Sequence, residues 1–395
     1  MASLKVMGYY DPLGEEKDLA KQIDTLVNTP EIKHVRIMAD KHLGYQSMPI
    51  GGVTVTGQWL APGGAGFDIG CGNWAGRTGL NIANLTRDDL ISIGSEIVNK
   101  IAFGNGVGYG TFADYPSLRY WVDATRHIGL PEHTIVNQFG SVGSGNHYID
   151  LMADESGDIW VVLHFGSRKF GYSVAQHYLN ILGAGDGMFS PPVFLDVNTD
   201  LGQEYLMDMQ MAGEYAMVSR RLVGLKVIAQ ILQNTVYETV ENHHNYIWKE
   251  THFGQEVFVT RKGSTPTYPG VPVFIGSSMA TDSVIVEADD CEDNDILFKS
   301  GMHGSGRVIG RAQAKGKWNR QGEMTRAPRV TQEMMDACLE DAGVVVFGGG
   351  VEESPHVYRN LVEDVLPYYP WLKVKHLLRP VLVVMAPDEG KHGRK

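Results

Sequence analysis

The chain has 395 residues, enough for one large domain or two of ordinary size, and 43% of them are hydrophobic. No apolar run approaches the roughly 20 residues that span a bilayer, and the N-terminus carries acids where a signal peptide needs basic and then apolar residues. The net charge of −12 argues against broad wrapping of nucleic acid, which depends on many lysines and arginines, but leaves room for a cleft that binds one strand end. We therefore expect a cytoplasmic protein without a membrane partner.

The three cysteines, Cys71, Cys291 and Cys338, form no CxxC pair and cannot build a disulfide framework. A single cysteine in a reducing compartment is usually a small core residue. A metal-binding role has to be argued from the residues beside it.

Secondary-structure signals mix strands and helices along the chain. Thr86-Arg87-Asp88-Asp89 has the form of a capping box and predicts a helix to about Lys100. The longest helical pattern runs from about Gly202 to Val240 with a break near Gly224, and its Met, Leu and Tyr residues are spaced as a core face. The other predicted helices are 331–341 and 356–365, and the predicted strands are 159–164, 256–260, 283–287, 344–347 and 381–384.

These elements do not alternate strictly as βαβ units, which argues against Rossmann and TIM arrangements. The chain also lacks GxGxxG after a strand and GxxxxGK[ST]. We predict an α+β fold of layered mixed β-sheets flanked by helices around a central metal-binding cleft, in one domain over 1–395 with a divergent polar tail from about 386 to 395.

Glycines cluster at 51–76, 140–145, 301–310 and 343–350, each beside an apolar run. Any one cluster is more often a tight turn than a site, and a lone histidine at a strand end is more often a core residue than a ligand. The first cluster nevertheless contains Asp68 and Cys71, and His147 follows the second. His164 ends a buried strand, and His244 stands in NHHNY. Carboxylate, thiol and imidazole groups together make a plausible ligand set for one or two divalent ions.

Two further motifs could serve phosphate chemistry. His164 is followed by Phe165 and then by Gly-Ser-Arg, which places Arg168 to meet a phosphate. His303 lies in GMHGSGR, where glycines allow a bulky partner such as a nucleotide to approach. A histidine without a metal can act as nucleophile and form a phosphoramidate.

The chain resembles the RtcB family of RNA ligases. The motifs FDIGCG, GSGNHYID, HFGSRKFG, NHHNYIWKE, TRKGST, HGSGRVIGRAQAK, EESPHVYRN and LRPVLVV occur in the family's order from about residue 35 to 385. The compact length resembles the shorter bacterial or phage branch. The resemblance implies a GTP- and Mn²⁺-dependent ligase that joins RNA 2′,3′-cyclic phosphate or 3′-phosphate ends to 5′-hydroxyl ends through a histidine–GMP intermediate.

The resemblance also implies residue roles. Cys71 would bridge two Mn²⁺ ions, one held by Asp68 and His147 and the other by His164 and His244. His303 would carry GMP, and Arg168 would contact an RNA or nucleotide phosphate. The implied nucleotide-binding residues are Asn146, Tyr148, Asp150, Ser278, Ser283, Gly304, Ser305, Gly306 and Tyr358. Implied partners are GTP, RNA with broken ends (tRNA halves or nuclease-cleaved RNA) and an archease-like activator.

Several positions depart from the family pattern. Asp150 replaces a glutamate that faces the base, and Met385 stands where a lysine would touch the nucleotide. We expect weaker selectivity for GTP, unless Lys391, Arg394 or Lys395 of the tail replaces that lysine. Three alternatives remain open: an enzyme that caps 3′-phosphate ends, a non-ligating RNA-end-binding relative, and a metallohydrolase that only opens cyclic phosphates.

Overall fold

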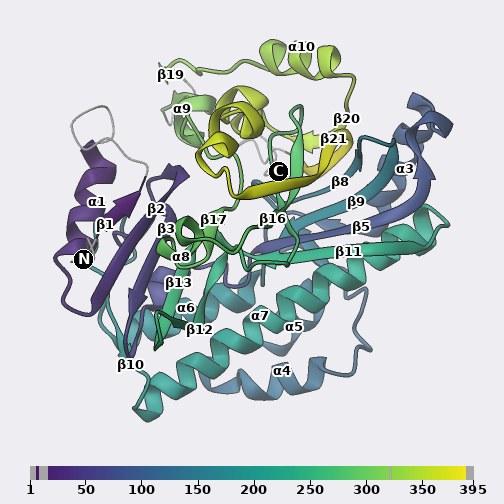
Figure 1. The fold of residues 1–395 in the computed structure, drawn as a ribbon. Coiled ribbons are helices and arrows are strands. Elements are labelled where there is room, and N and C mark those ends of the chain that lie inside the picture. Colours follow the sequence, from purple (N-terminus) through teal and green to yellow (C-terminus); the bar gives the residue numbers. More distant parts are fainter. Residues whose placement is uncertain (1–5, 9–16, 320, 322, 388–395) are drawn as a thin grey trace.

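The structure is a computed structural model that describes residues 6–8, 17–319, 321 and 323–387. Its architecture is mixed α+β, as predicted, with sheets of five and eight strands flanked by helices (Figure 1). The tail residues Lys391, Arg394 and Lys395 lie outside the described residues. No helix in the described part is long and apolar enough to cross a membrane.

The five-stranded sheet has β1 and β2 in parallel and the other neighbours antiparallel. Valines of β3 and β13 pack from this sheet into a buried cluster that also contains Met302, next to the predicted nucleophile. Its strands, in spatial order, are β1 (Val6–Gly8), β2 (Ile32–His42), β3 (Ile50–Thr56), β13 (Gln255–Lys262) and β12 (Asn245–His252).

The eight-stranded sheet is organised around one long bent strand, β21. Its first half pairs with β16 and its second half with β8, while β20 lies parallel to it. The order is β11 (Val236–His243), β5 (Gly72–Asn81), β9 (Asp158–Phe165), β8 (Tyr148–Ala153), β21 (Leu372–Pro387), β16 (Ser283–Ala288) and β15 (Val273–Ile275), with β20 (Val345–Gly349) beside β21.

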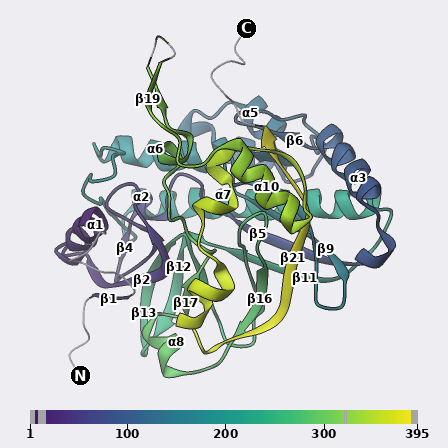
Figure 2. The same cartoon turned by 90° about the horizontal axis from the view of Figure 1, so that it is seen from above.

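Short two-stranded ladders complete the strand inventory of the described residues. The β18–β19 ladder projects from the body of the molecule (Figure 2). These ladders are β4 (Trp59–Leu60) with β10 (Leu195–Asp196), β6 (Ala102–Phe103) with β7 (Ser141–Gly143), β14 (Ser264–Pro266) with β17 (Ser300–Met302), and β18 (Lys317–Trp318) with β19 (Met324–Arg326).

Helices cover the eight-stranded sheet on the side where α7 crosses β5 and β9, with α4 and α5 beyond it (Figure 1). The α7 residues Tyr205, Met209 and Tyr215 are buried, as predicted for its core face. The helices are α1 (Lys17–Val27), α2 (Pro62–Ala65), α3 (Arg87–Lys100), α4 (Leu118–Ala124), α5 (Glu132–Gln138), α6 (Lys169–Ile181), α7 (Asp200–Lys226), α8 (Glu292–Ile296), α9 (Arg311–Lys315) and α10 (Gln332–Ala342).

The strand predictions and two helix predictions are confirmed. The Thr86 capping box opens α3, with Thr86 and Asp89 bonding each other's backbone amides, and α10 matches the helix predicted over 331–341. β21 extends well beyond the predicted 381–384 because two partner strands pair with it.

One helix prediction is right only in its first part, and another is wrong. The long helix ends with α7 and a π-helical turn at Val227–Ile231, and 236–243 is β11, so NHHNY closes a strand. The run VYETVENH is rich in β-branched residues and pairs with β5, and this pairing outweighs its weak helical spacing. The segment 356–365 contains only a 3₁₀ turn (Pro355–Val357) and a π turn (Leu361–Val365), since Tyr358 between them bridges Arg307.

The chain crosses from one sheet to the other at His244. β11 ends at His243 in the eight-stranded sheet, and β12 begins at Asn245 in the five-stranded sheet. His244 N donates to Cys71 O at 2.9 Å, and His244 O accepts from Ser264 N at 3.2 Å. The residue at the crossing is therefore fixed by the segment before β5 and by β14.

Candidate metal centre

Five side chains from four segments converge at this crossing. They form two groups that share Cys71, one with Asp68 and His147 and the other with His164 and His244, and the candidate ligand atoms of each group lie within 4.8 Å of one another. Cys71 Sγ is 3.6 Å from Nε2 of both His147 and His164, and Asp68 Oδ2 is 3.0 Å from His147 Nε2. Donors of these types suit one divalent ion per group.

Glycines let the ligand-bearing segments approach closely. Asp68 and Cys71 leave one turn, in which Cys71 N donates to Asp68 O at 3.1 Å. A Cβ at Gly166 would lie 2.3 Å from Asp68 Oδ1, and Gly70 has a φ of 69°, which favours glycine. The glycines beside the ligands therefore make the cluster sterically possible.

Arg220 of α7 supports the cluster from below. Its fully buried guanidinium donates to Gly70 O and Phe165 O, both at 2.7 Å, and to His243 Nδ1 at 2.9 Å. One side chain thus ties together the turn of Cys71, the end of β9 and the end of β11. Sequence analysis missed this residue, because on an otherwise core-facing helix it carries no motif.

The outer nitrogens of two histidines are fixed by oxygen acceptors. His147 Nδ1 lies 3.0 Å from Val142 O, and His164 Nδ1 lies 2.7 Å from Asn73 Oδ1. Each acceptor requires a proton on Nδ1, which leaves the Nε2 lone pair facing the cluster. Such outer partners orient metal-ligating imidazoles.

Burial affects the protonation of the candidate ligands in ways that are compatible with metal binding. Desolvation, and then the neighbouring histidines, lower the pKa values of His164 and His244 well below the usual value, so both are neutral at pH 7. Burial and Asp68 raise the pKa of the Cys71 thiol, whose proton a metal ion would displace. His244 Nδ1 is buried without a hydrogen-bond partner in the described part of the chain, a costly arrangement that coordination would relieve. The residues fit the implied metal pair.

His303 lies beside the cluster and belongs to neither group. Its ring centroid is 4.8 Å from that of His244, and its Nδ1 lies 2.7 Å from Oδ2 of the fully buried Asp40. The same oxygen accepts the backbone N–H groups of His303 (3.0 Å) and Gly304 (3.3 Å). Asp40 therefore places the His303 proton on Nδ1 and leaves Nε2 free to react. Sequence analysis missed Asp40, whose signal is a carboxylate near the end of the largely buried strand β2.

Arg168 is held in a backbone conformation that L-residues rarely adopt, with φ 58° and ψ −141°. Its guanidinium donates to Gly104 O at 3.1 Å and lies 3.4 Å from Ser141 Oγ. A Cβ at Gly143 would overlap this guanidinium. The charge of Arg168 also reaches Asp68: burial works to raise the Asp68 pKa, but His147 and Arg168 together lower it.

Two arginines that sequence analysis did not single out lie near the predicted nucleotide residues. Arg311 Nε donates to Glu353 Oε1 at 2.9 Å, and its Nη2 lies 3.5 Å from Asn146 Oδ1. Arg307 Nη1 donates to Glu353 Oε2 at 3.1 Å and to Tyr358 Oη at 2.9 Å. Their pattern was visible as HGSGRVIGR, but spacing alone did not indicate where they point.

The structure brings several predicted nucleotide residues around Gly276. Gly304 bridges Gly276, Ser305 N donates to Gly276 O at 3.1 Å, and a Cβ at Gly276 would lie 3.0 Å from Tyr148 Oη. The Tyr148 ring stacks on His164, with centroids 5.4 Å apart.

Two serines of the following loop are engaged within it. Ser278 Oγ is 2.7 Å from Thr281 Oγ1, and Ser283 Oγ accepts from Ser277 N at 2.9 Å. Tyr358 and Asn146 reach this group through Arg307 and Arg311, and Gly306 O accepts from Arg359 N at 3.0 Å. Residues 304–307 join the Arg307 and Arg311 contacts to the loop at Gly276, so these predicted nucleotide-binding residues lie in one region.

Asp150 lies in an apolar part of this region. It follows Tyr148 on the same face of β8, opposite Val383 of β21, and Met385 stands opposite Tyr148. Val383 and Met385 belong to a buried cluster with Met279, against which Tyr148 packs. Burial raises the Asp150 pKa well above its usual value, and Asp150 Oδ1 has no hydrogen-bond partner among the described residues.

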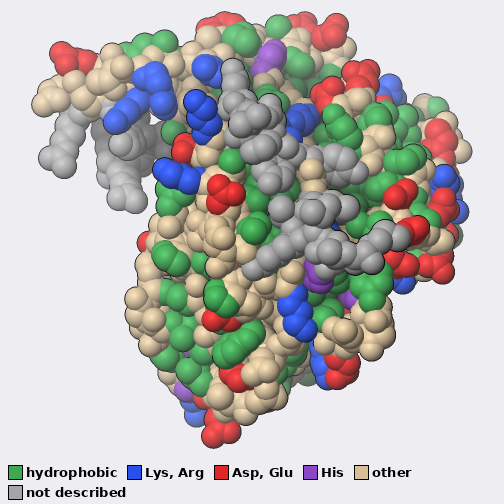
Figure 3. Space-filling view, turned by 60° about the vertical axis from the view of Figure 1, so that its left-hand side comes forward, with side chains coloured by type: hydrophobic (Ala, Val, Ile, Leu, Met, Phe, Trp, Pro, Cys, Tyr) green, Lys and Arg blue, Asp and Glu red, His purple; other side chains and the backbone are tan. Residues whose placement is uncertain are grey.

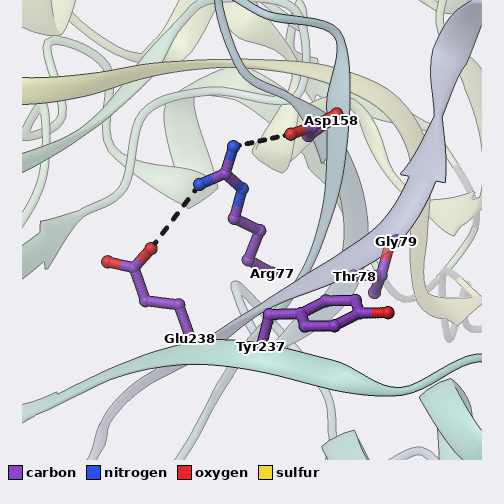
Figure 4. A pocket seen from close by; sticks show the side chains of 6 residues that line it. All are labelled: Arg77, Thr78, Gly79, Asp158, Tyr237 and Glu238. Carbon is purple, nitrogen blue, oxygen red and sulfur yellow. Dashed lines mark hydrogen bonds and ion pairs between the residues drawn. The ribbon is translucent and has the colours of Figure 1, made fainter.

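A cavity of about 360 Å³ lies elsewhere, on strands β5, β9 and β11 (Figure 4). Arg77 donates to Asp158 at 2.6 Å and lies 3.9 Å from Glu238, so its charge is already paired. None of the five candidate metal ligands lines this cavity. The cavity is therefore separate from the metal centre.

The fold and the cluster define a class of protein: a mixed α+β protein with a candidate metal site, in which two groups of His, Cys and Asp share Cys71, beside a histidine that is hydrogen-bonded to a carboxylate. The family described as "tRNA-splicing ligase RtcB" matches residues 22–128 and 123–386, so the chain belongs to the RtcB family. The RNA-splicing ligase RtcB of Escherichia coli K12 is 28% identical, over 93% of this chain and 94% of that protein. The tRNA-splicing ligases RtcB of Nanoarchaeum equitans and Archaeoglobus fulgidus are 25% and 28% identical, over 95% and 89% of this chain and 92% and 87% of their own.

Proposed function

We propose that this chain is an RNA ligase that uses GTP and two Mn²⁺ ions to join 2′,3′-cyclic phosphate or 3′-phosphate ends to 5′-hydroxyl ends through a GMP adduct of His303. The names of the relatives, RNA-splicing and tRNA-splicing ligases, support the RNA substrate. The observation that carries the proposal is Cys71, shared by two metal-binding groups, beside a histidine that Asp40 orients.

The metal pair would be held by Asp68, Cys71 and His147 on one side and by Cys71, His164 and His244 on the other. When bound, the ions would neutralise phosphate charge and stabilise attacking and leaving oxygens. Mn²⁺ is not favoured over Zn²⁺ or Co²⁺ by affinity for these donors alone, so the last two should compete.

His303 provides the covalent step. Its Nε2 lone pair attacks the α-phosphorus of GTP, a P–N bond forms, and pyrophosphate leaves. Asp40 keeps the proton on Nδ1 and stabilises the positive charge that develops on the ring. An RNA 3′-phosphate oxygen then attacks the same phosphorus, and the P–N bond breaks.

The final step joins the strands. The 5′-hydroxyl oxygen attacks the RNA 3′-phosphorus and releases its proton. The P–O bond between that phosphorus and GMP breaks, and GMP leaves. A 3′-phosphate is a poor electrophile until GMP supplies this leaving group. Arg168, with a guanidinium fixed beside the centre, would hold a phosphate during the exchange.

Labelled GTP tests the proposal. Incubation with α-labelled GTP and Mn²⁺ should label the wild type, and the label should be lost in acid and survive alkali, as a phosphoramidate requires. His303→Ala should retain metal but take no label, whereas Cys71→Ala should lose both metal and label.

RNA ends then separate the alternatives. Joined product is expected from a 3′-phosphate strand and a 5′-hydroxyl strand. A labelled protein that stops at the GMP-capped 3′ end would be a capping enzyme. Cyclic-phosphate opening without label would indicate a hydrolase, and RNA-end binding without label or turnover would indicate a binding protein. Each of these outcomes would contradict the ligase.

A further inference from the structure

A row of three aromatic rings leads from the metal centre to the protein surface. Phe67 directly precedes the candidate ligand Asp68, and its ring centroid lies 6.2 Å from that of Tyr45 and 5.4 Å from that of Tyr172. The Tyr45 and Tyr172 side chains are 55% and 40% exposed. We call Tyr45, Phe67 and Tyr172 the aromatic row.

The aromatic row is not part of the core. None of its residues belongs to the hydrophobic clusters that the described residues form. Exposed Met188 and Phe189 lie on the neighbouring segment, which accepts hydrogen bonds from the backbone N–H groups just after Tyr45. Adjoining exposed apolar side chains of this size mark an interaction surface.

Backbone strain fixes one end of the row. Gln46 and Ser47, which follow Tyr45, have φ values of 54° and 53°, in the left-handed region. They are held there by backbone bonds to Gly187 O (2.8 Å) and Met188 O (3.0 Å). Conformations of this kind persist only where the surroundings enforce them, and they gather at functional sites. The fold therefore holds Tyr45 at the surface at a conformational cost.

One exposed cation and one buried lysine lie beside the rings. Lys169 Nζ lies 4.0 Å from the centroid of Tyr172, at the start of α6, and its side chain is exposed. Lys262 Nζ lies beneath the row, 2.9 Å from Tyr45 O. Elsewhere the chain is acidic overall, and acidic side chains lie among the basic ones on the face shown in Figure 3. A polyanion would thus find few lysines here, but aromatic faces beside them.

We propose that the aromatic row stacks the unpaired bases of the RNA strand whose end is bound in the metal centre. This deepens the proposed ligase function and rests on it. Phe67 is covalently adjacent to Asp68, so a strand that leaves the centre along this side meets the rings within its first nucleotides. Stacking binds any base and needs little charge, which suits a protein with net charge −12.

The arrangement selects single strands. The rings of Phe67 and Tyr172 are tilted by 31°, and those of Tyr45 and Phe67 by 80°, so bases must be splayed from a regular stack to meet them. Bases inside a duplex are not available for this. The Lys169 ammonium would leave the Tyr172 face to a base and move to a phosphate.

Fluorescence anisotropy with a labelled ten-nucleotide RNA that carries a 3′-phosphate tests the proposal. Tyr45→Ala and Tyr172→Ala should each weaken binding about 5- to 150-fold, the range for loss of one stacked base, while Tyr172→Trp should retain it. The matched control is Tyr237→Ala, a 72% exposed tyrosine beside the distant cavity of Figure 4, which should bind as the wild type does. Unfolding midpoints establish that the variants are folded.

An abasic strand separates stacking from general damage. RNA that lacks the two bases nearest the 3′-phosphate should bind the wild type more weakly, and Tyr172→Ala should add no further loss. Lys169→Gln should reduce the slope of log K against log salt by about 0.7. Independent, additive losses, or equally tight binding of a blunt duplex, would overturn the proposal. Unchanged RNA affinity in both tyrosine variants would also overturn the proposal. The aromatic row would then be interpreted as a surface that binds another protein.

Failure of the stacking proposal can be distinguished from failure of the ligase proposal. The first is measured by RNA affinity, and the second by GMP labelling of the wild type. If the wild type is labelled by GTP but binds intact and abasic RNA equally tightly, only the stacking proposal is refuted. An unlabelled protein that shows the stacking pattern would refute the ligase and keep the row.

Discussion

The Asp40 carboxylate decides which ring nitrogen of His303 can react. Asp40→Asn keeps the size of the side chain, but its amide nitrogen can donate to Nδ1 and so favour the tautomer with the proton on Nε2. We expect GMP labelling to fall by about 10² to 10⁴, the scale seen when a histidine loses its orienting carboxylate. Mn²⁺ content should stay at the wild-type level, since Asp40 belongs to neither metal group. Labelling at the normal rate would show that another group orients His303.

The expected loss of base selectivity rests on Asp150 and Met385. Burial among apolar neighbours raises the Asp150 pKa well above its usual value, and Met385 offers no donor to guanine O6. One missing charged hydrogen bond corresponds to about ten- to a hundredfold weaker discrimination. We therefore expect labelling by ATP, ITP and dGTP at a substantial fraction of the GTP rate. A chain truncated after Pro387 reports whether the tail contributes, and strict use of GTP by both chains would refute the expectation.

The candidate ligands carried by short motifs could be indicated from the sequence, while the residues that support them could not. Asp68 and Cys71 share one turn, and Gly145 and Gly166 lie two residues from His147 and His164, so local sequence indicates these four candidates. Asp40 and His303 lie 263 positions apart, and the contact between β2 and β17, which ends just before His303, brings them together. The same applies to Arg220, two of whose three acceptors are backbone carbonyls that no side-chain pattern can reveal.

At the scale of elements, the turn after β9 makes room for the turn before β5. Gly166→Ala would place a methyl group on the Asp68 carboxylate, 2.3 Å from Oδ1. We expect metal content to fall from two ions per chain toward one, because Cys71, His164 and His244 are left intact. Gly57→Ala is the control, since only the flexible end of Lys33 lies near that position. Metal analysis after gel filtration reads both variants, and two tightly held ions in Gly166→Ala would contradict the assignment of Asp68.

The spacing of apolar residues predicted helices and strands well where one face of the element is buried. It predicted them poorly where pairing with a distant segment determines the secondary structure. α3 carries its own cap, so its start was readable to the residue. β11 has weak spacing for either state, and its strand form comes from β5, more than 150 residues earlier in the chain. Segment 356–365 fails as a helix for a related reason, since Tyr358 is drawn into a bridge with Arg307.

At the scale of the whole molecule, a buried ion pair joins β12 to β13. Arg261 is fully buried and donates to Glu250 Oε1 at 2.5 Å and Oε2 at 3.1 Å, and Tyr268 Oη donates to Oε1 at 2.6 Å. Burial works to raise the Glu250 pKa, but Arg261 and the hydrogen bonds lower it from 4.5 to about 2. Its stabilisation is therefore complete above pH 4.5 and is lost as pH falls toward 2.

Glu250→Gln should destabilise the protein by about 3 kcal/mol at pH 7, since Arg261 is left without its counter-charge. The difference in unfolding midpoint between variant and wild type should shrink between pH 4.5 and 2. Glu256→Gln removes a surface pair with Lys249 and should cost less than about 1 kcal/mol at any pH. A pH-independent difference for Glu250→Gln would show that the pair contributes through packing alone.

The crossing at His244 has a mechanical consequence. The backbone there is the only direct covalent step between β11 of one sheet and β12 of the other, and its side chain is a candidate ligand. Coordination would pin both sheets to one rigid point, so that separating them requires breaking a metal–nitrogen bond. Amide hydrogen exchange in 236–252 should therefore slow by at least tenfold when Mn²⁺ is added, whereas exchange in the remote helix α10 should not change. Equal protection from hydrogen exchange with and without Mn²⁺ would mean that packing alone holds the two sheets together. Metal binding would then complete the site without making the protein more rigid.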